Sequence, residues 1–356
     1  MKQKRWGVFF ILFAVISLVL AGCGDDDDDG GDTTTTEAGG DSGDNGDSGS
    51  SGDLKVGMVF DVGGKGDKSF NDSAFKGLTE AAEEFDVEVR ELEPDAEGSN
   101  REALMRQLAD EGYGLIIGVG FAFAEVMPAI VADYPDTEFA IVDSVVEADN
   151  VASLVFAEEQ GSFLVGAIAA QKSEAGHIGF VGGVETQLIQ KFEAGFVAGA
   201  KAVNPDIVVD VKYITPDGDF SGFADPARGK TVAAGLYAGG ADIVYHAAGQ
   251  SGNGVIEAAV EADALVIGVD SNQYLSASPE AQPHILTSML KRVDVAVFNT
   301  IEAWVNGEFT AGTSLFSLEN DGVGFATDGD LIVDVDAINE LRDQIVAGEI
   351  EVPTEP

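Results

Sequence analysis

The body of this chain alternates short apolar runs with longer stretches of helical period, and this rhythm constrains the fold more than any other feature. Residues 55–62 form the first apolar run. Residues 69–85 follow, with apolar side chains recurring at intervals of three and four. Short apolar runs predict buried strands, and the 3.6-residue period predicts helices packed on them. Alternation of this kind predicts parallel sheets covered on both faces.

The alternation runs through one series of elements and then restarts. The expected strands are residues 55–62, 87–92, 115–119, 139–142 and 151–155, then 177–181, 207–214, 243–247 and 265–269. The expected helices are residues 69–85, 100–112, 187–203, 226–237 and 252–261. A late strand at 286–288, a helix at 294–306, a strand at 322–326 and a final helix at 335–347 complete the pattern. Two sheets in series predict a two-lobed α/β protein, with ligands bound where loops leave the carboxyl ends of the strands.

The N-terminus predicts export and a lipid anchor. Three cations within the first five residues precede an apolar run over residues 6–19, and small residues lead into Cys23, the only cysteine of the chain. This arrangement resembles a bacterial lipobox. We predict a signal peptide over residues 1–22 and a lipid on Cys23, which would hold the protein at the extracytoplasmic face of the cell membrane. The alternatives are an uncleaved anchor, or a signal peptide with an accidental cysteine.

The charge of the chain excludes some classes of partner. Residues 23–53 form a predicted disordered tether, composed mainly of Asp, Gly, Ser and Thr with eleven acidic residues. Residues 54–356 hold the remaining 52 acidic and 16 basic residues, a net charge of about −36. Nucleic acids and anionic membrane surfaces are bound through cationic faces. We therefore expect no nucleic-acid partner, and membrane contact only through the lipid on Cys23.

A set of short motifs runs through the body in a fixed order. They are Asp61-Val-Gly-Gly with Asp67-Lys-Ser-Phe-Asn71, Gly161-Ser-Phe-Leu-Val-Gly166, Ile178-Gly-Phe-Val-Gly-Gly183, Phe192-Glu-Ala-Gly-Phe-Val-Ala-Gly199, Gly222-Phe-Ala-Asp-Pro-Ala-Arg-Gly-Lys230, Ala247-Ala-Gly-Gln-Ser-Gly-Asn-Gly254, Gly268-Val-Asp270 and Thr287-Ser-Met-Leu-Lys291. The set spans about residues 54–350 and resembles the basic membrane protein (PnrA-like) family. Those proteins are lipoproteins that bind solutes, typically purine nucleosides, for ABC importers.

The resemblance implies a type I periplasmic-binding-protein fold, in which two Rossmann-like lobes with parallel sheets are joined by a hinge of several strands. The expected N-terminal lobe comprises residues 54–156 plus approximately 289–312. The expected C-terminal lobe comprises residues 157–288 plus approximately 313–356. The partners that it implies are a purine nucleoside and an ABC permease, and we expect a monomer that needs no cofactor and no metal.

The resemblance also implies how the base of a nucleoside would be held. Phe70 would stack on one face of the base, and Phe223 would cover the other face from the opposite lobe. Asn71 and Asp143 would bind the purine edge, the amide as donor and acceptor and the carboxylate as acceptor. A carboxylate there favours guanine or hypoxanthine over adenine. Phe220, three residues before Phe223, is an alternative second ring.

The sugar-binding residues implied by the resemblance are Asp270 and Lys291, with Asp61 and Gly249 completing a polar wall. Each predicted residue also has an ordinary structural interpretation. The two aromatic rings could belong to the core, Asn71 could be an N-cap, and the strand-end carboxylates could cap turns. Lys291 could lie on the surface.

Three short motifs resemble enzyme motifs but lack the neighbouring sequence features that those enzymes require. Residues 224–231 fit a relaxed phosphate-loop pattern, but Pro226 stiffens a loop that does not directly follow a strand. Ser288-Met-Leu-Lys291 is an S-x-x-K sequence without its partner motifs. Gly118-Val-Gly120 lacks the third glycine of a dinucleotide fingerprint. We therefore predict a binding protein and no enzyme. The alternatives are the same fold binding a sugar, autoinducer or other solute, a nucleoside hydrolase, and a surface adhesin or sensor without a permease.

Overall fold

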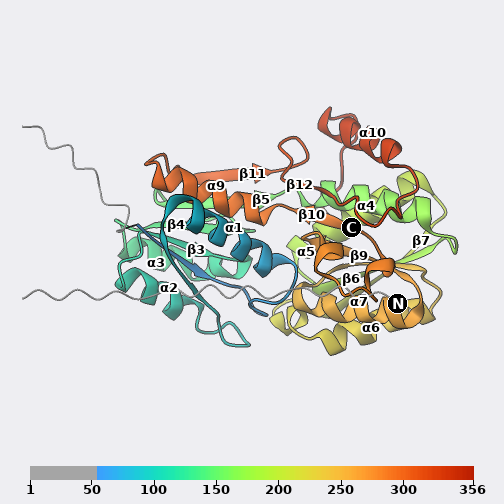
Figure 1. The fold of residues 1–356 in the computed structure, drawn as a ribbon, viewed down its shortest axis with the longest axis horizontal. Coiled ribbons are helices and arrows are strands. Elements are labelled where there is room, and N and C mark those ends of the chain that lie inside the picture. Colours follow the sequence, from blue (N-terminus) through green and yellow to red (C-terminus); the bar gives the residue numbers. More distant parts are fainter. Residues whose placement is uncertain (1–53) are drawn as a thin grey trace, which may run out of the picture. The chain divides into compact units, whose positions relative to one another are not determined.

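Two sheets organise the part of the chain that the structure describes. The computed structural model describes residues 54–356, which form two lobes, each built on its own six-stranded sheet (Figure 1). The predicted signal peptide, Cys23 and the acidic tether lie outside the described residues. No helix among residues 54–356 is long and apolar enough to cross a membrane. The described body has the α/β architecture expected from the alternation of strands and helices.

The sheet of the N-terminal lobe is entirely parallel. Its strands, in spatial order, are β11 (Gly312–Phe316), β5 (Val151–Phe156), β4 (Glu138–Val142), β3 (Leu115–Gly118), β1 (Lys55–Val59) and β2 (Glu88–Leu92). Helices α1 (Phe70–Phe85) and α9 (Val293–Val305) pack on one face. Helices α2 (Arg101–Asp110) and α3 (Met127–Asp133) pack on the other. Alternate side chains of the central strands enter these two cores, which is why the strands are continuously apolar.

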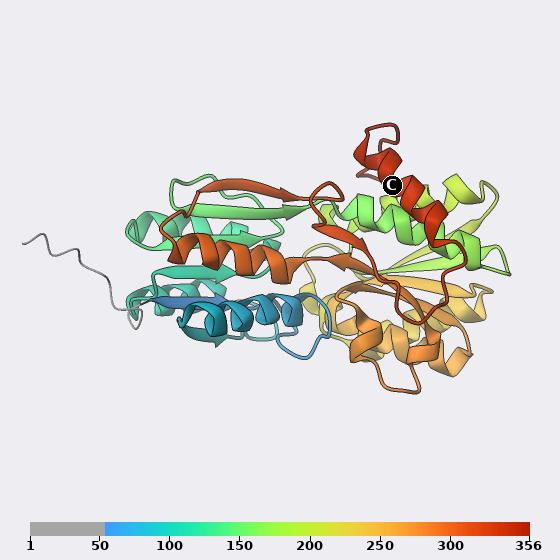
Figure 2. The ribbon, with the colours of Figure 1, turned by 45° about the horizontal axis from the view of Figure 1, so that its top comes forward.

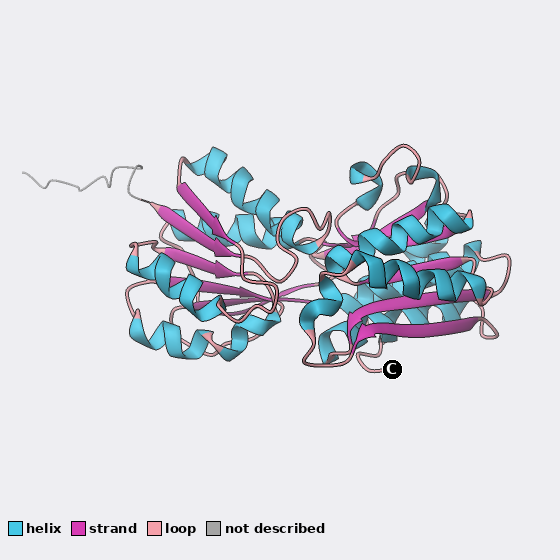
Figure 3. Ribbon diagram, turned by 90° about the horizontal axis from the view of Figure 1, so that it is seen from below, coloured by secondary structure: helices cyan, strands magenta, loops and turns pink. Residues whose placement is uncertain are grey.

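The sheet of the C-terminal lobe has the same plan with one antiparallel edge. Its order is β12 (Val323–Phe325), β10 (Ile285–Lys291), β9 (Leu265–Asp270), β8 (Ile243–Ala247), β6 (His177–Val184) and β7 (Val208–Thr215), and only the β12 pairing is antiparallel. Helices α4 (Glu158–Lys172) and α5 (Gln187–Val203) cover one face, and α6 (Pro226–Ala238) and α7 (Gly252–Ala262) cover the other. Figure 3 shows helices packed against the strands in both lobes. Helix α10 (Val335–Val346) packs against α4.

Glycines bring α4 and α5 into close contact. A Cβ atom at Gly199 would lie 1.9 Å from the carbonyl oxygen of Phe163, and one at Gly166 would lie 2.1 Å from that of Phe196. Real Cβ atoms do not approach backbone oxygen so closely, so only glycine permits this spacing. The motifs around residues 161–166 and 192–199 therefore have a packing role within the C-terminal lobe.

Within the described body the chain crosses between the lobes three times, and these crossings form the hinge (Figure 2). They lie between β5 and α4, between β10 and α9, and between β11 and β12. The boundaries expected at residues 289 and 312 need correction. Residues 289–291 pair within the C-terminal sheet, and residues 312–316 pair with β5 in the N-terminal sheet. Strand pairing places the second crossing after Lys291 and the third after Phe316.

Candidate functional site

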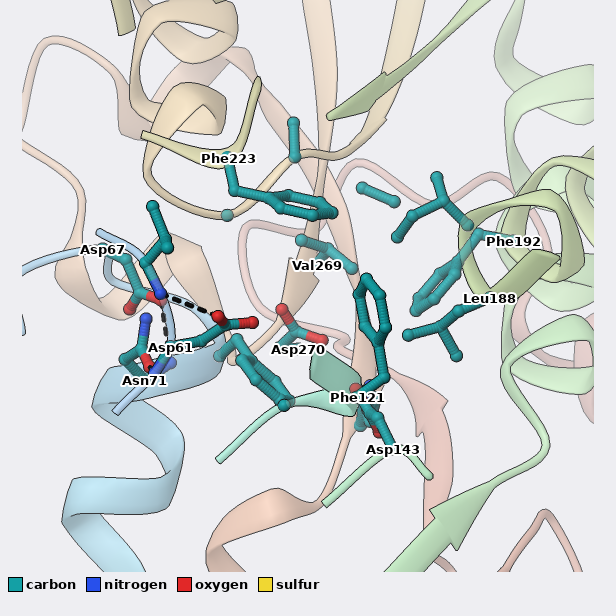
Figure 4. A pocket seen from close by; sticks show the side chains of 18 residues that line it. Asp61, Asp67, Asn71, Phe121, Asp143, Leu188, Phe192, Phe223, Val269 and Asp270 are labelled. Atoms are coloured by element: carbon teal, nitrogen blue, oxygen red, sulfur yellow. Dashed lines mark hydrogen bonds and ion pairs between the residues drawn. The ribbon is translucent and has the colours of Figure 1, made fainter. Parts of the chain in front are cut away.

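A cavity, partly open to solvent, lies between the lobes where loops leave the carboxyl ends of the strands. Its lining consists of Asp61, Val62, Asp67, Phe70, Asn71, Gly120, Phe121, Asp143, Leu188, Ile189, Phe192, Phe223, Ala247, Ala248, Gly249, Val269, Asp270 and Lys291. Figure 4 shows carboxylates and aromatic rings from both lobes around one space.

Asp61, just after β1, is held firmly at the cavity wall. Its backbone N–H donates to Oδ1 of Asn71 (2.9 Å), and its Oδ1 accepts from Nη2 of the buried Arg101 (2.9 Å). Burial raises the pKa of Asp61, although the guanidinium of Arg101 acts in the opposite direction. Oδ2 lies beside Gly120, where a Cβ atom would come within 2.4 Å and where φ is 115°. Asp61 is thus a fixed acceptor, and Asn71 is left with its amide N–H groups as donors.

Asp67 organises the start of helix α1. Its carboxylate accepts from the backbone N–H groups of Ser69 (2.9 Å), Asn71 (2.8 Å) and Asp72 (3.1 Å). Burial raises the pKa of Asp67 to about 7, against the effect of these hydrogen bonds. Because α1 begins here, Phe70 and Asn71 face the cavity from its first turn.

Among the residues that the structure describes, Lys291 is the single buried cation that lines the cavity. Its Nζ donates to Oδ2 of Asp143 and lies 3.7 Å from Oε1 of Glu158. It also lies 4.8, 5.1 and 5.5 Å from the ring centroids of Phe70, Phe156 and Phe192. Burial alone would lower the pKa of Lys291, but the nearby carboxylates outweigh burial and raise it. The amine therefore stays charged among rings whose faces favour a cation.

Glu158 stands behind Lys291 at the first crossing between lobes. Its other oxygen accepts from Lys191 on α5 (3.2 Å). Burial raises the pKa of Glu158 to about 7, with Lys291 and Lys191 acting against it. A row of alternating charges therefore runs from Asp143 in the N-terminal lobe through Lys291 and Glu158 to the surface at Lys191.

Two strand-end carboxylates have left-handed backbones. Asp143 follows β4 with φ of 68°, and Asp270 ends β9 with φ of 62°. Aspartate tolerates this conformation better than bulky residues do, and such residues concentrate at functional sites. Oδ1 of Asp143 is buried and has no hydrogen-bond partner among the described residues. Oδ2 of Asp270 accepts from Oγ of Ser69 across the lobe boundary (2.6 Å), and burial raises the pKa of Asp270.

The aromatic side chains of the lining come from both lobes. Phe70 and Phe121 belong to the N-terminal lobe, and Phe192 and Phe223 belong to the C-terminal lobe. Figure 4 shows the ring of Phe223 above the carboxylates of Asp61 and Asp270. A Cβ atom at Gly183 would lie 2.4 Å from the Phe223 ring, so this glycine makes room for it.

The family model for PnrA-like ABC transporter substrate-binding proteins, named Bmp, matches residues 54–355. The chain belongs to this family. As a Bmp protein it is an extracytoplasmic substrate-binding protein of an ABC transporter, with a solute as ligand and a permease as partner, and it is not an enzyme. This confirms the predicted family and class of protein.

Curated relatives match nearly all of this Bmp protein. The "CD4+ T-cell-stimulating antigen" of Listeria innocua is 34% identical over 377 residues and covers 100% of both chains. The "ABC transporter nucleoside-binding protein BmpA" of Lactococcus lactis subsp. cremoris is 34% identical over 372 residues, covering 99% of this chain and 100% of the relative. "Basic membrane protein A" of Borreliella burgdorferi is 34% identical over 312 residues, covering 84% and 88%.

Solved structures of ABC transporter solute-binding proteins share the fold. One from Aeropyrum pernix K1 superposes with a TM-score of 0.73 at 30% identity, covering 85% of this chain and 93% of that chain. One from Conexibacter woesei superposes with a TM-score of 0.67 at 23% identity, covering 85% and 99%. These superpositions confirm the predicted two-lobed α/β fold of type I periplasmic binding proteins.

The cavity of this Bmp protein brings together every residue that the sequence predicted for ligand binding. These are Asp61, Phe70, Asn71, Asp143, Phe223, Gly249, Asp270 and Lys291. Phe220 is absent from the lining, whereas Phe223 is part of it. Sequence reasoning did not select Asp67, Phe121, Leu188 or Phe192 for the site. Asp67 and Phe192 lie within the motifs at residues 67–71 and 192–199, so the sequence did contain an indication of their role. Among residues 54–356 no group of three or more His, Cys, Asp and Glu side chains could hold a metal ion.

Proposed function

We propose that the cavity binds a purine nucleoside and that the protein delivers it to the permease as a lipid-anchored monomer. The observation that carries the proposal is the pairing of Phe70 and Phe223, one ring from each lobe, within a single cavity lining. Rings on two sides suit a flat aromatic base, and stacking contributes about 1–3 kcal/mol per contact with little demand on base identity. The name of the Lactococcus relative, a nucleoside-binding protein, also supports a nucleoside ligand.

The polar groups of the cavity suit the edges of a nucleoside. Asn71 offers amide donors, because its oxygen is already bound to the N–H of Asp61. Asp143 offers a buried oxygen with no hydrogen-bond partner among residues 54–356, and such an acceptor is stabilised by a ligand N–H or O–H group. Carboxylates at Asp61 and Asp270 are suitable acceptors for ribose hydroxyls.

The charge of the cavity favours a neutral ligand. From residues 54–356, four carboxylates line it together with one ammonium, that of Lys291, which already pairs with Asp143. A nucleotide would bring its phosphate charges into this acidic surrounding, and like charges placed together in a buried site are costly. We therefore expect nucleosides to bind and their 5′-monophosphates to bind at least a hundredfold more weakly.

Isothermal titration calorimetry tests the proposal. Guanosine, inosine and adenosine are titrated alongside ribose and guanosine 5′-monophosphate. Phe70→Ala and Phe223→Ala should each weaken nucleoside binding by about 5- to 150-fold, corresponding to about 1–3 kcal/mol. Phe309→Ala, a half-buried ring between α9 and β11, is the matched control and should leave affinity unchanged. Binding of ribose alone, or of no nucleoside, would refute the proposal.

A further inference from the structure

The short turn that carries Phe223 carries a second ring that faces the other lobe. This turn, η3 (Phe220–Phe223), belongs to the C-terminal lobe. Phe223 lines the cavity, whereas Phe220 lies outside the lining and packs edge-to-face on Phe121 of the N-terminal lobe. The two ring centroids are 5.7 Å apart, with 66° between the planes. An edge-to-face pair of this geometry contributes beyond the area that it buries.

Phe220 also covers a buried cation. The guanidinium carbon of Arg101 lies 5.6 Å from the centroid of Phe220 and 5.7 Å from that of Phe123. The same guanidinium holds Asp61 at the cavity wall, and its Nε is buried without a hydrogen-bond partner among the described residues. The ring of Phe220 therefore replaces water beside a cation that is part of the binding site's support.

The turn is fixed to the C-terminal lobe, so its two rings must move together. Oγ of Ser251 donates to the carbonyl oxygen of Gly222 (2.8 Å). A Cβ atom at Gly222 would lie 2.2 Å from the carbonyl oxygen of Gly183 on β6. The side chain of Asp219 accepts from the N–H of Ser221 at the start of the turn. When the lobes separate about the hinge, Phe220 must leave Phe121 and Arg101 as Phe223 leaves the cavity.

We propose that Phe220 is a closure residue, which docks against Phe121 and Arg101 when the lobes close and slows ligand release without touching the ligand. The inference rests on the proposed nucleoside site, in which Phe223 is a stacking ring. It assigns different roles to two phenylalanines three residues apart, one toward the ligand and one toward the opposite lobe. The contact with Phe220 forms whenever the lobes close, in the free protein as well as around a ligand, so its loss should accelerate opening and leave the encounter with the ligand unaffected.

Stopped-flow kinetics of the purified protein with inosine test this role. Phe220→Ala should raise the dissociation rate constant by about tenfold, from the loss of an aromatic pair and a cation–π contact, and change the association rate constant by less than about twofold. Phe220→Trp, which keeps a ring at this position, should dissociate within about threefold of the wild-type rate. Phe309→Ala, equally half-buried but remote from the closure contact, should release inosine at the wild-type rate.

A second measurement separates this inference from the proposed function. Amide hydrogen exchange is followed over η2 (Phe121–Glu125) in protein without ligand, and Phe220→Ala should accelerate it whereas Phe309→Ala should not. If inosine fails to bind the wild type but exchange responds in this way, the nucleoside proposal fails and the closure role stands. Unchanged dissociation together with unchanged exchange would overturn the closure role. A fall in the unfolding midpoint as large as that of a core Phe→Ala variant would also overturn it, because the ring would then support the fold of one lobe.

Discussion

Replacement of Lys291 by methionine tests how the buried charges of the cavity are balanced. Methionine has similar length and an adaptable apolar side chain, so it fits among the surrounding aromatic rings. The variant removes the cation that pairs with Asp143 and lies 3.7 Å from Glu158. Removing one partner of a buried ion pair destabilises a protein by about 3–5 kcal/mol, because the other charge remains buried without compensation. For a chain of this size the expected fall in Tm is roughly 5–8 °C.

The destabilisation should depend on pH in a defined direction. Burial already raises the pKa of Glu158 to about 7 in the presence of Lys291. Loss of the lysine raises the pKa of Glu158 further. Near neutral pH the Glu158 carboxyl is then protonated in the folded variant and ionised in the unfolded chain, where its pKa is ordinary. A raised folded-state pKa gives stability that is fully present at low pH and is lost as pH rises through it. The difference between wild type and Lys291→Met should therefore be larger at pH 8 than at pH 5.

Urea unfolding at pH 5, 6.5 and 8 measures this difference, with Lys191→Met as the matched control. Lys191 also pairs with Glu158 (3.2 Å), but 34% of its side chain is exposed, and exposed pairs contribute about 0–1 kcal/mol. The account predicts a large, pH-dependent loss for Lys291→Met and a small loss for Lys191→Met. Equal losses in the two variants, or a loss below about 1 kcal/mol at pH 8 for Lys291→Met, would refute the reasoning.

Two further predictions concern stability away from the cavity. Burial lowers the pKa of His246 to about 4, although the neighbouring Gln273 acts in the opposite direction. The free energy of unfolding of the wild type should therefore fall by about 3 kcal/mol between pH 6.5 and 4, whereas His246→Gln should not show this fall. Parallel pH profiles of the two proteins in urea unfolding would contradict this. Gly199→Ala should destabilise the protein by about 1–3 kcal/mol, because its Cβ would lie 1.9 Å from the oxygen of Phe163, whereas Gly235→Ala on α6, with open space at its Cβ, should be neutral or stabilising by up to about 1 kcal/mol. Thermal unfolding that ranks these two variants in the opposite order would show that the close contact of α4 and α5 is not as described.

Hydrophobic patterning predicted amphipathic helices and short, continuously apolar strands, and it missed elements that have neither pattern. Helix α5 and strand β8 have the predicted bounds. Helix α4 was not predicted, because apolar residues surround its axis and ten consecutive positions, Gly161 to Ala170, are buried. A helix buried on all sides shows no polar stripe. Strand β11 was not predicted, because it is a largely exposed edge strand of Gly, Thr, Ser, Leu and Phe.

The candidate site was predicted through the resemblance, and its supporting residues depend on contacts between distant segments. Phe121 enters the lining only because a turn after β3 meets the opposite lobe. Glu158 and Arg101 do not line the cavity but hold residues that do. Glu158 lies close to Lys291, more than a hundred positions away, and Arg101 pairs with Asp61, forty positions away. No local sequence pattern identifies such distant partners. The distinction between Phe220 and Phe223 likewise requires the direction of each ring about one turn, which the sequence does not specify.

A crystal structure of the protein with its copurified ligand would show what the cavity binds. We expect a purine nucleoside in the cavity, with the base between Phe70 and Phe223 and the ribose hydroxyls bound near Asp270. A sugar or other ligand without a flat base, or a nucleoside bound outside this cavity, would contradict it.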